Sequence, residues 1–272
     1  NTVNPFGIIF NPNSIKKLIS RAINQVQFTD SDIFFHNERW HCYEVHSDLS
    51  IDNKHQFLDS LNSLLEFTNQ QITQSTHIII TYGTSWIYRL KSTNEVVANC
   101  HKVPQQEFNK EILSVKEIEK SIQITIDLIH KTNPNVNFIF TISPVRHIKD
   151  GFAENQRSKA HLITALQTAI CHLPPATYFP SYEIMMDELR DYRFYAEDML
   201  HPSKVAIDYI WKRFSETTFT KESHLIMDEI EKIQKGLNHR PFNPNSCSHQ
   251  QFLSKLHENI AVIQKQFPLI KF

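Results

Sequence analysis

The strongest constraint in this 272-residue sequence is a repeated order: a short apolar run, a turn, and then a helix-length amphipathic segment. Three runs are rich in β-branched and aromatic residues, and each stops at a turn that contains glycine or proline. They are Thr76–Thr81, Val136–Ile142 and Ala176–Phe179. Short apolar runs bounded in this way are typical of buried β-strands, so we expect a strand at each of the three.

Apolar residues recur at helical spacing in four segments between and after these runs. The segments are 53–72, 114–131, 154–172 and 202–217. Strands that alternate with amphipathic helices build parallel βαβ units, whose sheet is covered by helices on both faces. The sequence therefore predicts an α/β fold: a three-layer α/β/α sandwich with a parallel sheet.

The last part of the chain has a different pattern. Two helices, 220–237 and 247–266, follow with no strand between them, which predicts a C-terminal helical hairpin. A chain of this length buries roughly 70–75% of its unfolded surface, so one large domain with a small appendage needs no disulfides or metals. We expect residues 1–217 to form the α/β domain and residues 218–272 to form the hairpin packed on it.

Smaller β elements are expected in the first hundred residues. Aromatic and apolar residues around Asn37-Glu38 predict a β-hairpin within 32–47, and 95–100 has the pattern of another strand. Asn1–Ile8 resembles the end of a strand that enters a turn, and no element precedes it. Either the sheet starts here, or a strand and a helix precede Asn1; we expect the second.

The charge balance argues against several classes of function. The sequence has 28 basic and 29 acidic side chains and a net charge of -1, which gives no field to draw it onto nucleic acid or anionic membranes. No apolar run reaches the roughly 18–20 residues that span a bilayer, and Asn1 begins a polar segment rather than a signal peptide. We expect a soluble protein with no nucleic-acid partner and no membrane span. The cytoplasm is favoured, although an export signal before Asn1 would change that.

Metal and cofactor sites are not indicated. The cysteines are scattered without a CxxC pair, at Cys42, Cys100, Cys171 and Cys247. His36, His41 and His46 gather in the expected hairpin, but strand alternation places His41 on the face opposite to the other two. We therefore expect no metal and no cofactor, and we interpret these histidines as surface or hydrogen-bonded groups. His46 stays a candidate pocket residue.

Candidate site residues follow two of the expected strands and precede the helix at 202–217. Reactive groups of open α/β sheets sit at the carboxyl ends of the strands, where this chain has Gly83-Thr84-Ser85-Trp86 and Ser143-Pro144-Val145-Arg146-His147. Asp198 and His201, three residues apart ahead of a helix, have the chemistry of the orienter and base of a catalytic triad. A helix-capping aspartate beside a surface histidine is the alternative.

The whole arrangement resembles the SGNH (GDSL-like) hydrolases, in which Asp-x-x-His precedes the last core helix, and more specifically the bacterial GSCFA family. The motifs that carry the resemblance cover nearly the whole chain in order. They are Asn4-Pro-Phe-Gly-Ile, Thr81-Tyr-Gly-Thr-Ser-Trp, Ala98-Asn-Cys-His-Lys-Val-Pro, Ser143-Pro-Val-Arg-His, Asn155-Gln-Arg-Ser-Lys and Tyr182 through Pro202. The resemblance implies a flavodoxin-like strand order and ester chemistry without a cofactor.

The resemblance also implies roles for single residues. A glycine after the second strand supplies an oxyanion-hole amide in these enzymes, and Gly7 matches it. A Gly-x-Asn turn after the third strand supplies the rest, and Gly83 opens that turn here. The asparagine of the turn is replaced by Ser85, whose hydroxyl donates one hydrogen bond, so Asn99 is a second candidate donor. The serine nucleophile belongs after the first strand.

The motif Gly-Ser-Cys-Phe-Ala, from which the family takes its name, is absent from residues 1–272. Its place is upstream of Asn1, so we expect the nucleophile on a strand and helix that precede this chain. Ser85 and Ser143 are the fallback nucleophiles, because both lie at expected strand ends.

Several further residues are candidates for substrate contacts. Asn99 and His101 follow the apolar pair at 96–97 and are expected in the pocket, with Cys100 in the core. Arg146 and His147 follow a strand end, and Asn155 and Lys159 lie one helical turn apart in the next helix. Together these groups could hold an anionic or carbonyl-bearing substrate; solvated loop and helix-capping roles are the alternative.

The sequence predicts a serine hydrolase that acts on a small-molecule or glycan ester, with an acylated carbohydrate as one candidate. An O-acyltransferase on a glycan would use the same residues if water were excluded. A non-catalytic binding protein that keeps the pocket without the chemistry is the alternative from another class.

Overall fold

The computed structural model describes residues 3–171, 173 and 176–272. By their contacts these divide into two compact units, Asn1–Asp208 and Tyr209–Phe272. Each unit is described by itself below.

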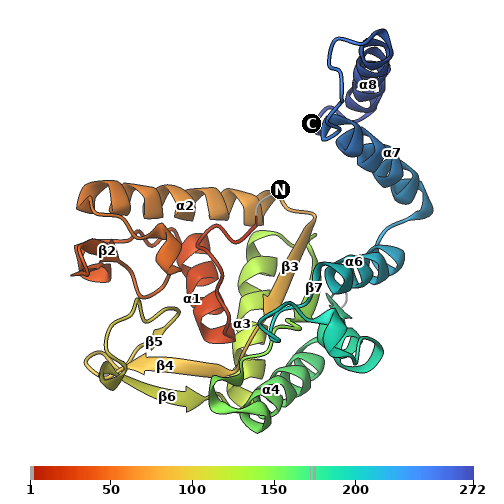
Figure 1. Cartoon of the computed structure of the whole chain (residues 1–272). Coiled ribbons are helices and arrows are strands. Elements are labelled where there is room, and N and C mark those ends of the chain that lie inside the picture. Colours follow the sequence, from red (N-terminus) through yellow and green to blue (C-terminus); the bar gives the residue numbers. More distant parts are fainter. Residues whose placement is uncertain (1–2, 172, 174–175) are drawn as a thin grey trace. The chain divides into compact units, whose positions relative to one another are not determined.

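A parallel sheet forms the centre of the first unit. Strands β3 (His77–Tyr82), β7 (Asn137–Ile142) and β8 (Ala176–Phe179) hydrogen-bond in the order β3-β7-β8 in the described part of the chain (Figure 1). Ile80 pairs with Phe140, and Phe138 pairs with Ala176, both in parallel register. The three predicted strands are confirmed, and the sequential order follows from helical crossovers of the same hand.

Helices flank this sheet, as the α/β prediction requires. Helix α6 (Lys204–Thr218) runs across the boundary between the units. The flanking helices are α1 (Pro12–Ile23), α2 (Lys54–Gln74), α3 (Val115–Thr132) and α4 (Phe152–Ile170). Polar side chains begin them: Asn11 accepts from the Ser14 amide, Asn53 from the Gln56 amide, and Ser114 forms a capping box with Glu117. The helices predicted from apolar spacing are thus present; His172, the predicted end of one, lies outside the described residues.

The core lies between the sheet and helices α1 to α4. The apolar stripe of α3 is completely buried at Ile118, Ile122, Ile126 and Ile129. It packs with strand side chains such as Phe138 and Phe140, whose rings stack with centroids 5.6 Å apart. Burial of this stripe is what the helical spacing of the sequence predicts.

A second, antiparallel sheet branches from the end of β3. It is built from β4 (Trp86–Leu90), β5 (Val96–Val97) and β6 (Phe108–Ile112), in the order β5-β4-β6. Only the strand at 95–100 was predicted, and it is reduced to two residues. Arg89 Nε and Glu111 Oε1 lie 3.2 Å apart and form an ion pair between β4 and β6. No local sequence pattern reveals this contact.

The amino-terminal segment contains the predicted hairpin but no strand before it. Strands β1 (Phe34–His36) and β2 (Arg39–His41) pair around Asn37 and Glu38, both with positive φ, as tight hairpin turns require. The prediction of a strand at 1–8 is wrong for the described residues of this segment, where Pro5 and Phe6 form a turn. Pro5 cannot donate to a ladder, and Gly7 has a φ of +78°, so neither suits a strand.

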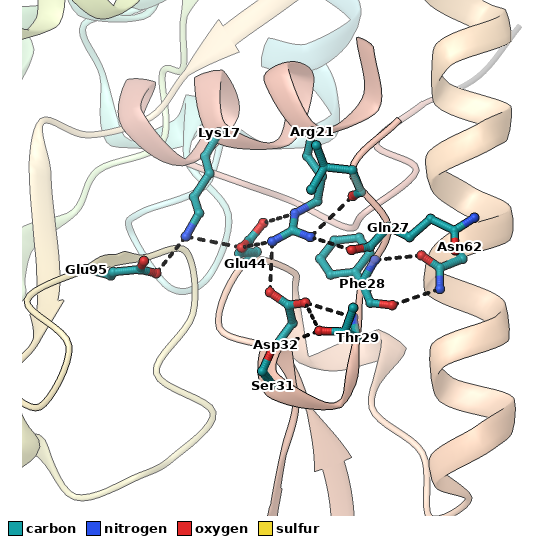
Figure 2. Close-up of polar contacts among 11 residues, drawn as sticks. Lys17, Arg21, Gln27, Phe28, Thr29, Ser31, Asp32, Glu44, Asn62 and Glu95 are labelled. Carbon is teal, nitrogen blue, oxygen red and sulfur yellow. Dashed lines mark hydrogen bonds and ion pairs between the residues drawn. The ribbon is translucent and has the colours of Figure 1, made fainter. Parts of the chain in front are cut away.

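An ion-pair network fixes α1 to the loops that surround it (Figure 2). The Arg21 guanidinium donates to both carboxylate oxygens of Glu44, at 2.9 and 2.8 Å, and to Asp32 at 2.9 Å. Lys17 bridges Glu44 and Glu95, at 3.1 and 2.8 Å. Because Arg21 and Glu44 are about nine-tenths buried, this network is part of the core of the unit.

Shorter elements complete the first unit. They are single 3₁₀ turns at Asp30–Asp32, Ser47–Leu49, Gln105–Glu107, Ile148–Asp150 and Tyr192–Phe194, and the short helix α5 (Ser181–Glu183) that continues as a π turn, Ile184–Glu188. In the part of the chain that the structure describes, no helix is both long and apolar enough to cross a bilayer.

The second unit contains the predicted helical hairpin. Helices α7 (Lys221–Leu237) and α8 (Cys247–Gln266) pack on a small apolar cluster of Ile233, Leu256 and Ile263. Gly236 allows this contact, since a Cβ there would come 2.7 Å from a methyl group of Leu256.

Candidate active site

The side chains of Asp198 and His201 form a short charged contact in the predicted site. Asp198 Oδ2 lies 2.6 Å from His201 Nδ1, and Asp198 Oδ1 accepts the amides of Leu200 and His201 at 2.9 and 3.0 Å. A tight turn places them, with Met199 at a φ of +60° and the Ala196 amide bonded to the His201 carbonyl. The amide and ring hydrogen bonds from His201, with the Leu200 amide, lower the pKa of Asp198 to about 2.

An ionised carboxylate only accepts hydrogen bonds, so Nδ1 of His201 carries its proton toward Asp198 and Nε2 presents a lone pair. The His201 side chain is 60% exposed, and no hydrogen bond to Nε2 is made by the described residues. This is the orientation that a general base needs.

The loop after β7 lies against this pair. The Arg146 amide donates to the Leu200 carbonyl at 3.2 Å, and Leu200 stands between Asp198 and His201 in the chain. The neighbouring imidazole of His147 has its pKa lowered to about 4, first by burial and then by the charges of Lys159 and His201. Nε2 of His147 is buried without a hydrogen-bond partner among the described residues. His147 is therefore a neutral ring at neutral pH.

Helix α4 holds both predicted site loops through polar side chains. Asn155 Oδ1 accepts the His147 amide at 2.9 Å. Ser158 Oγ accepts the Ser85 amide at 2.8 Å and lies 3.0 Å from the Thr84 hydroxyl. These contacts position the two loops on the helix.

Lys159 joins the carboxyl ends of β3 and β7. Its amine donates to the carbonyl oxygens of Gly83 and Ser143, each at 2.7 Å, and lies 5.3 Å from the centre of the Tyr182 ring. Lys159 is 1% exposed, and burial lowers its pKa to about 7. Lys159 therefore influences the site by holding the two loops in place, because its side chain does not reach solvent.

Gly83 makes a close approach at the end of β3. A Cβ on Gly83 would come 3.1 Å from the Phe10 ring and 3.4 Å from His147 Nε2. The Gly83 and Thr84 amides both donate to the Phe10 carbonyl, at 2.8 and 3.2 Å, and the Phe10 ring packs edge-on against His147. The amides at this strand end are thus occupied by the segment that precedes α1.

Gly7 and His46 lie in contact. A Cβ on Gly7 would come 2.2 Å from the Cβ of His46, and the His46 amide donates to the Phe6 carbonyl at 3.0 Å. The Gly7 amide donates to the Asn4 carbonyl at 2.8 Å, and the His46 ring lies 3.2 Å from Asp48. Residues 4–11 therefore connect this pair with the Gly83 end of the site.

His101 has a buried ring with hydrogen-bonding partners at both nitrogens. Its Nε2 lies 2.7 Å from the Cys42 carbonyl and its Nδ1 lies 3.2 Å from His41 Nδ1. Burial lowers the pKa of His101 to about 4, with a further contribution from His41. Asn99 Oδ1 accepts the His101 amide at 2.8 Å, which leaves the Asn99 amide group available as a donor.

The structure thus brings the predicted residues into two groups. Asp198, His201, Arg146, His147 and Gly83 share one, and Gly7, His46, Asn99 and His101 form the other around the hairpin. Burial raises the pKa of Cys100 to about 11, and the Lys149 charge opposes this shift. Among the described residues no group of His, Cys, Asp or Glu side chains could hold a metal.

Neither fallback nucleophile contacts His201 through a described hydrogen bond. The Ser85 side chain is fully buried, and its hydroxyl bonds to the Ser158 carbonyl and hydroxyl at 3.2 and 3.0 Å. The Ser143 hydroxyl accepts the Val145 amide at 3.2 Å.

The positioning role of Lys159 is the feature that reasoning from sequence missed. Lys159 shares the apolar stripe of α4 with Leu162 and Leu166 and lies one turn after Asn155. A lysine in register with a buried stripe is rare, so this register was the available signal.

Comparison with protein families gives two matches, which follow one another along the chain. The family described as the GSCFA family matches residues 1–214, and the C-terminal domain of GSCFA domain proteins matches residues 230–272. Comparison with curated proteins and with solved structures gives no match.

Proposed function

We propose, from the premise that this chain belongs to the GSCFA family, that Asp198 and His201 are the acid–base pair of an SGNH-type serine hydrolase that cleaves an ester. The observation that carries the proposal is the 2.6 Å contact between Asp198 Oδ2 and His201 Nδ1, which leaves His201 Nε2 facing away with a lone pair. An oriented imidazole of this kind is the base of hydrolytic triads on several unrelated folds.

In the proposed reaction His201 Nε2 takes the proton of a serine hydroxyl as its oxygen attacks the ester carbonyl. Asp198 holds the ring and stabilises the imidazolium. His201 then returns the proton to the departing alcohol oxygen, and water releases the acyl group by the same two proton transfers. The proposal requires a serine hydroxyl within hydrogen-bonding reach of His201 Nε2, and Ser143, after β7, is the candidate among the described residues.

We propose Asn99 as the oxyanion donor because its N–H groups have no described partner, although it lies in the group around the hairpin and no described contact joins it to His201. The amides of Gly7 and Gly83 already donate to the carbonyls of Asn4 and Phe10, and the Ser85 hydroxyl is bonded to Ser158. The Asn99 side chain accepts with its oxygen and keeps its N–H groups free of described partners. A positioned donor of this kind contributes about 3 kcal/mol to the transition state.

The proposal is tested by assaying the protein as its gene encodes it with short-chain aryl esters. His201→Ala is expected to lower kcat/KM by about 100- to 10,000-fold, the usual contribution of a general base. Asp198→Asn should lower it as well, because the ring then loses its charged orienter. His55→Ala is the matched control, since His55 is an exposed histidine near the start of α2, and should leave the rate unchanged.

The outcomes separate the classes of function. Ester formation that depends on an added sugar alcohol would identify an acyltransferase that uses the same pair. Equal background rates for the parent, His201→Ala and Asp198→Asn would contradict both enzymes and favour a binding protein.

A further inference from the structure

Arg146 has an unusual set of neighbours for a charged side chain. Its guanidinium carbon lies 4.0 Å from the centre of the Tyr195 ring, 5.4 Å from that of Tyr192 and 6.0 Å from that of Phe152. The three rings come from three segments: the turn before Asp198, the 3₁₀ turn at 192–194, and the first residue of α4. Together they form an aromatic cage around one cation.

No carboxylate lies within 4.0 Å of the Arg146 guanidinium among the residues that the structure describes. The other partly buried arginines differ. Arg21 donates to Glu44 and Asp32, and Arg89 donates to Glu111. A guanidinium whose ring-facing side is removed from water is stabilised most by a charged hydrogen-bond acceptor. The three rings of the cage supply no such acceptor.

The cage adjoins the proposed base. The Arg146 amide is bonded to the carbonyl of Leu200, inside the Asp198–His201 turn, and Tyr195 forms a β-bridge with Pro202, the residue after His201. Tyr195 is 7% exposed, whereas Tyr192 and Phe152 are 55% and 60% exposed. The cage is therefore anchored on one ring and open on the side of the other two.

We infer that Arg146 is a binding residue for a single carboxylate on the substrate. The substrate class is then an anionic ester, such as the monoester of a dicarboxylic acid, whose free carboxylate meets Arg146 while its ester carbonyl meets His201. The planar fork of arginine matches the two oxygens of a carboxylate, and one unpaired positive charge balances one negative charge. This inference rests on the proposed function for the identity of the reacting ester, and the binding site itself can be tested separately.

The test measures equilibrium binding to His201→Ala protein, so that turnover does not enter. The probes are the mono-4-nitrobenzyl ester of succinic acid, which is anionic, and 4-nitrobenzyl butyrate, which is neutral and of similar size. Isothermal titration calorimetry is expected to show tighter binding of the anionic ester, weakened by added sodium chloride. The double variant with Arg146→Met should bind the anionic ester about 10- to 100-fold more weakly, the usual effect of a lost charge-assisted hydrogen bond.

Two further variants separate charge from folding. Arg146→Lys keeps the charge but not the fork, so its affinity for the anionic ester should fall between those of the parent and Arg146→Met. Arg157→Met is the matched control, because among the described residues Arg157 on α4 pairs only with Glu154, at 3.5 Å, and its side chain is 53% exposed. It should not change either affinity. Circular dichroism of each variant checks that the variant is folded.

Equal affinity for the two esters, no binding of the anionic ester, or undiminished binding after Arg146→Met would each overturn the inference. Selective binding that depends on Arg146, combined with no hydrolysis of any ester by the native protein, would contradict the proposed hydrolase and leave the carboxylate site standing.

Discussion

The side-chain nitrogen of Lys159 lies 2.7 Å from the carbonyl oxygen of Gly83. The same nitrogen reaches the Ser143 carbonyl, so one buried amine spans the carboxyl ends of β3 and β7. An amine with only neutral acceptors is costly to keep charged, and burial accordingly lowers the pKa of Lys159 to about 7.

The substitution Lys159→Met should lower the free energy of unfolding by an amount that grows with pH. It leaves two carbonyl acceptors without donors, which costs about 2–4 kcal/mol in total. In the parent, Lys159 binds a proton less readily when folded, because its pKa is about 7 against the ordinary lysine value of 10.5. The unfolded chain therefore binds more protons between these values, and parent stability rises with pH across that window.

Urea unfolding of the parent and Lys159→Met at pH 7 and pH 9.5 measures this difference. The gap between the two proteins should be wider at pH 9.5. Lys120→Met, at an exposed position of α3, is the control and should show no such widening. A gap that shrinks with pH would contradict the buried-amine account.

The ring of His147 predicts a second pH dependence, in the acid range. Burial, with the charges of Lys159 and His201, lowers the pKa of His147 to about 4 from 6.5. Between these values the unfolded chain binds more protons, so stability contributed by neutral His147 is lost as the pH falls from 6.5 toward 4. The substitution His147→Phe keeps a ring against Phe10 and removes the titration.

Thermal unfolding of His147→Phe at pH 7 and pH 5 should therefore show a smaller loss of Tm on acidification than the parent shows. His55→Phe, at an exposed site, should behave as the parent does. If His147→Phe loses as much Tm as the parent, the ring is not held neutral by its surroundings.

Gly7 and Gly151 form a matched pair for testing close packing at the site. Both have positive φ, +78° and +93°, so alanine is strained at either position. Only at Gly7 would the added Cβ meet a neighbour, at 2.2 Å from the Cβ of His46; nothing lies within 4 Å at Gly151. Gly7→Ala should therefore cost about 1–3 kcal/mol more than Gly151→Ala in chemical denaturation, the usual penalty of overpacking. Equal costs would show that His46 moves away freely.

The network of Figure 2 predicts a large effect from a single charge. Arg21→Met removes the cation that pairs with Asp32 and one of the two cations that pair with Glu44, which is 9% exposed and keeps only the Lys17 contact at 3.1 Å among the described residues. Breaking one side of such a buried pair costs about 2–4 kcal/mol, whereas Arg157→Met, which breaks an exposed pair, should change the free energy of unfolding by no more than about 0.5 kcal/mol.

Acid should weaken the same network. Burial opposes ionisation of Asp32, but hydrogen bonds from Thr29 and the Arg21 charge outweigh it and lower the pKa of Asp32 below 3.8. The stability from this carboxylate is present above pH 3.8 and is lost as the pH falls further. Denaturation curves of parent and Arg21→Met should therefore converge below that pH; parallel curves would exclude a charge effect.

Local patterns predicted the elements that bury an apolar stripe. Strands β3 and β7 and helices α2, α3 and α4 follow from the spacing of their own side chains. The antiparallel strands β4 and β6 do not, because they are joined by contacts between distant residues such as Arg89 and Glu111. The strand expected at the start of the chain fails in the described residues for a local reason, the backbone of Pro5 and Gly7.

The same division holds within the candidate site. The pairing of Asp198 with His201 was predicted, because three residues and a turn suffice to make it. The burial of Ser85 was not predicted, because it depends on a hydrogen bond with Ser158, 73 residues later in the chain. The role of Lys159 likewise depends on where two strand ends meet.

Asn155, Ser158 and Lys159 occupy little more than one turn of α4 and hold the ends of two strands. A helix turn is rigid, so the loops at 83–86 and 143–147 move together as one body with it. The Asp198–His201 turn is joined to that body by the bond between the Arg146 amide and the Leu200 carbonyl. We expect any opening of the site to move the histidine turn relative to this body, so hydrogen exchange should find the amide of Arg146 less protected than that of His147.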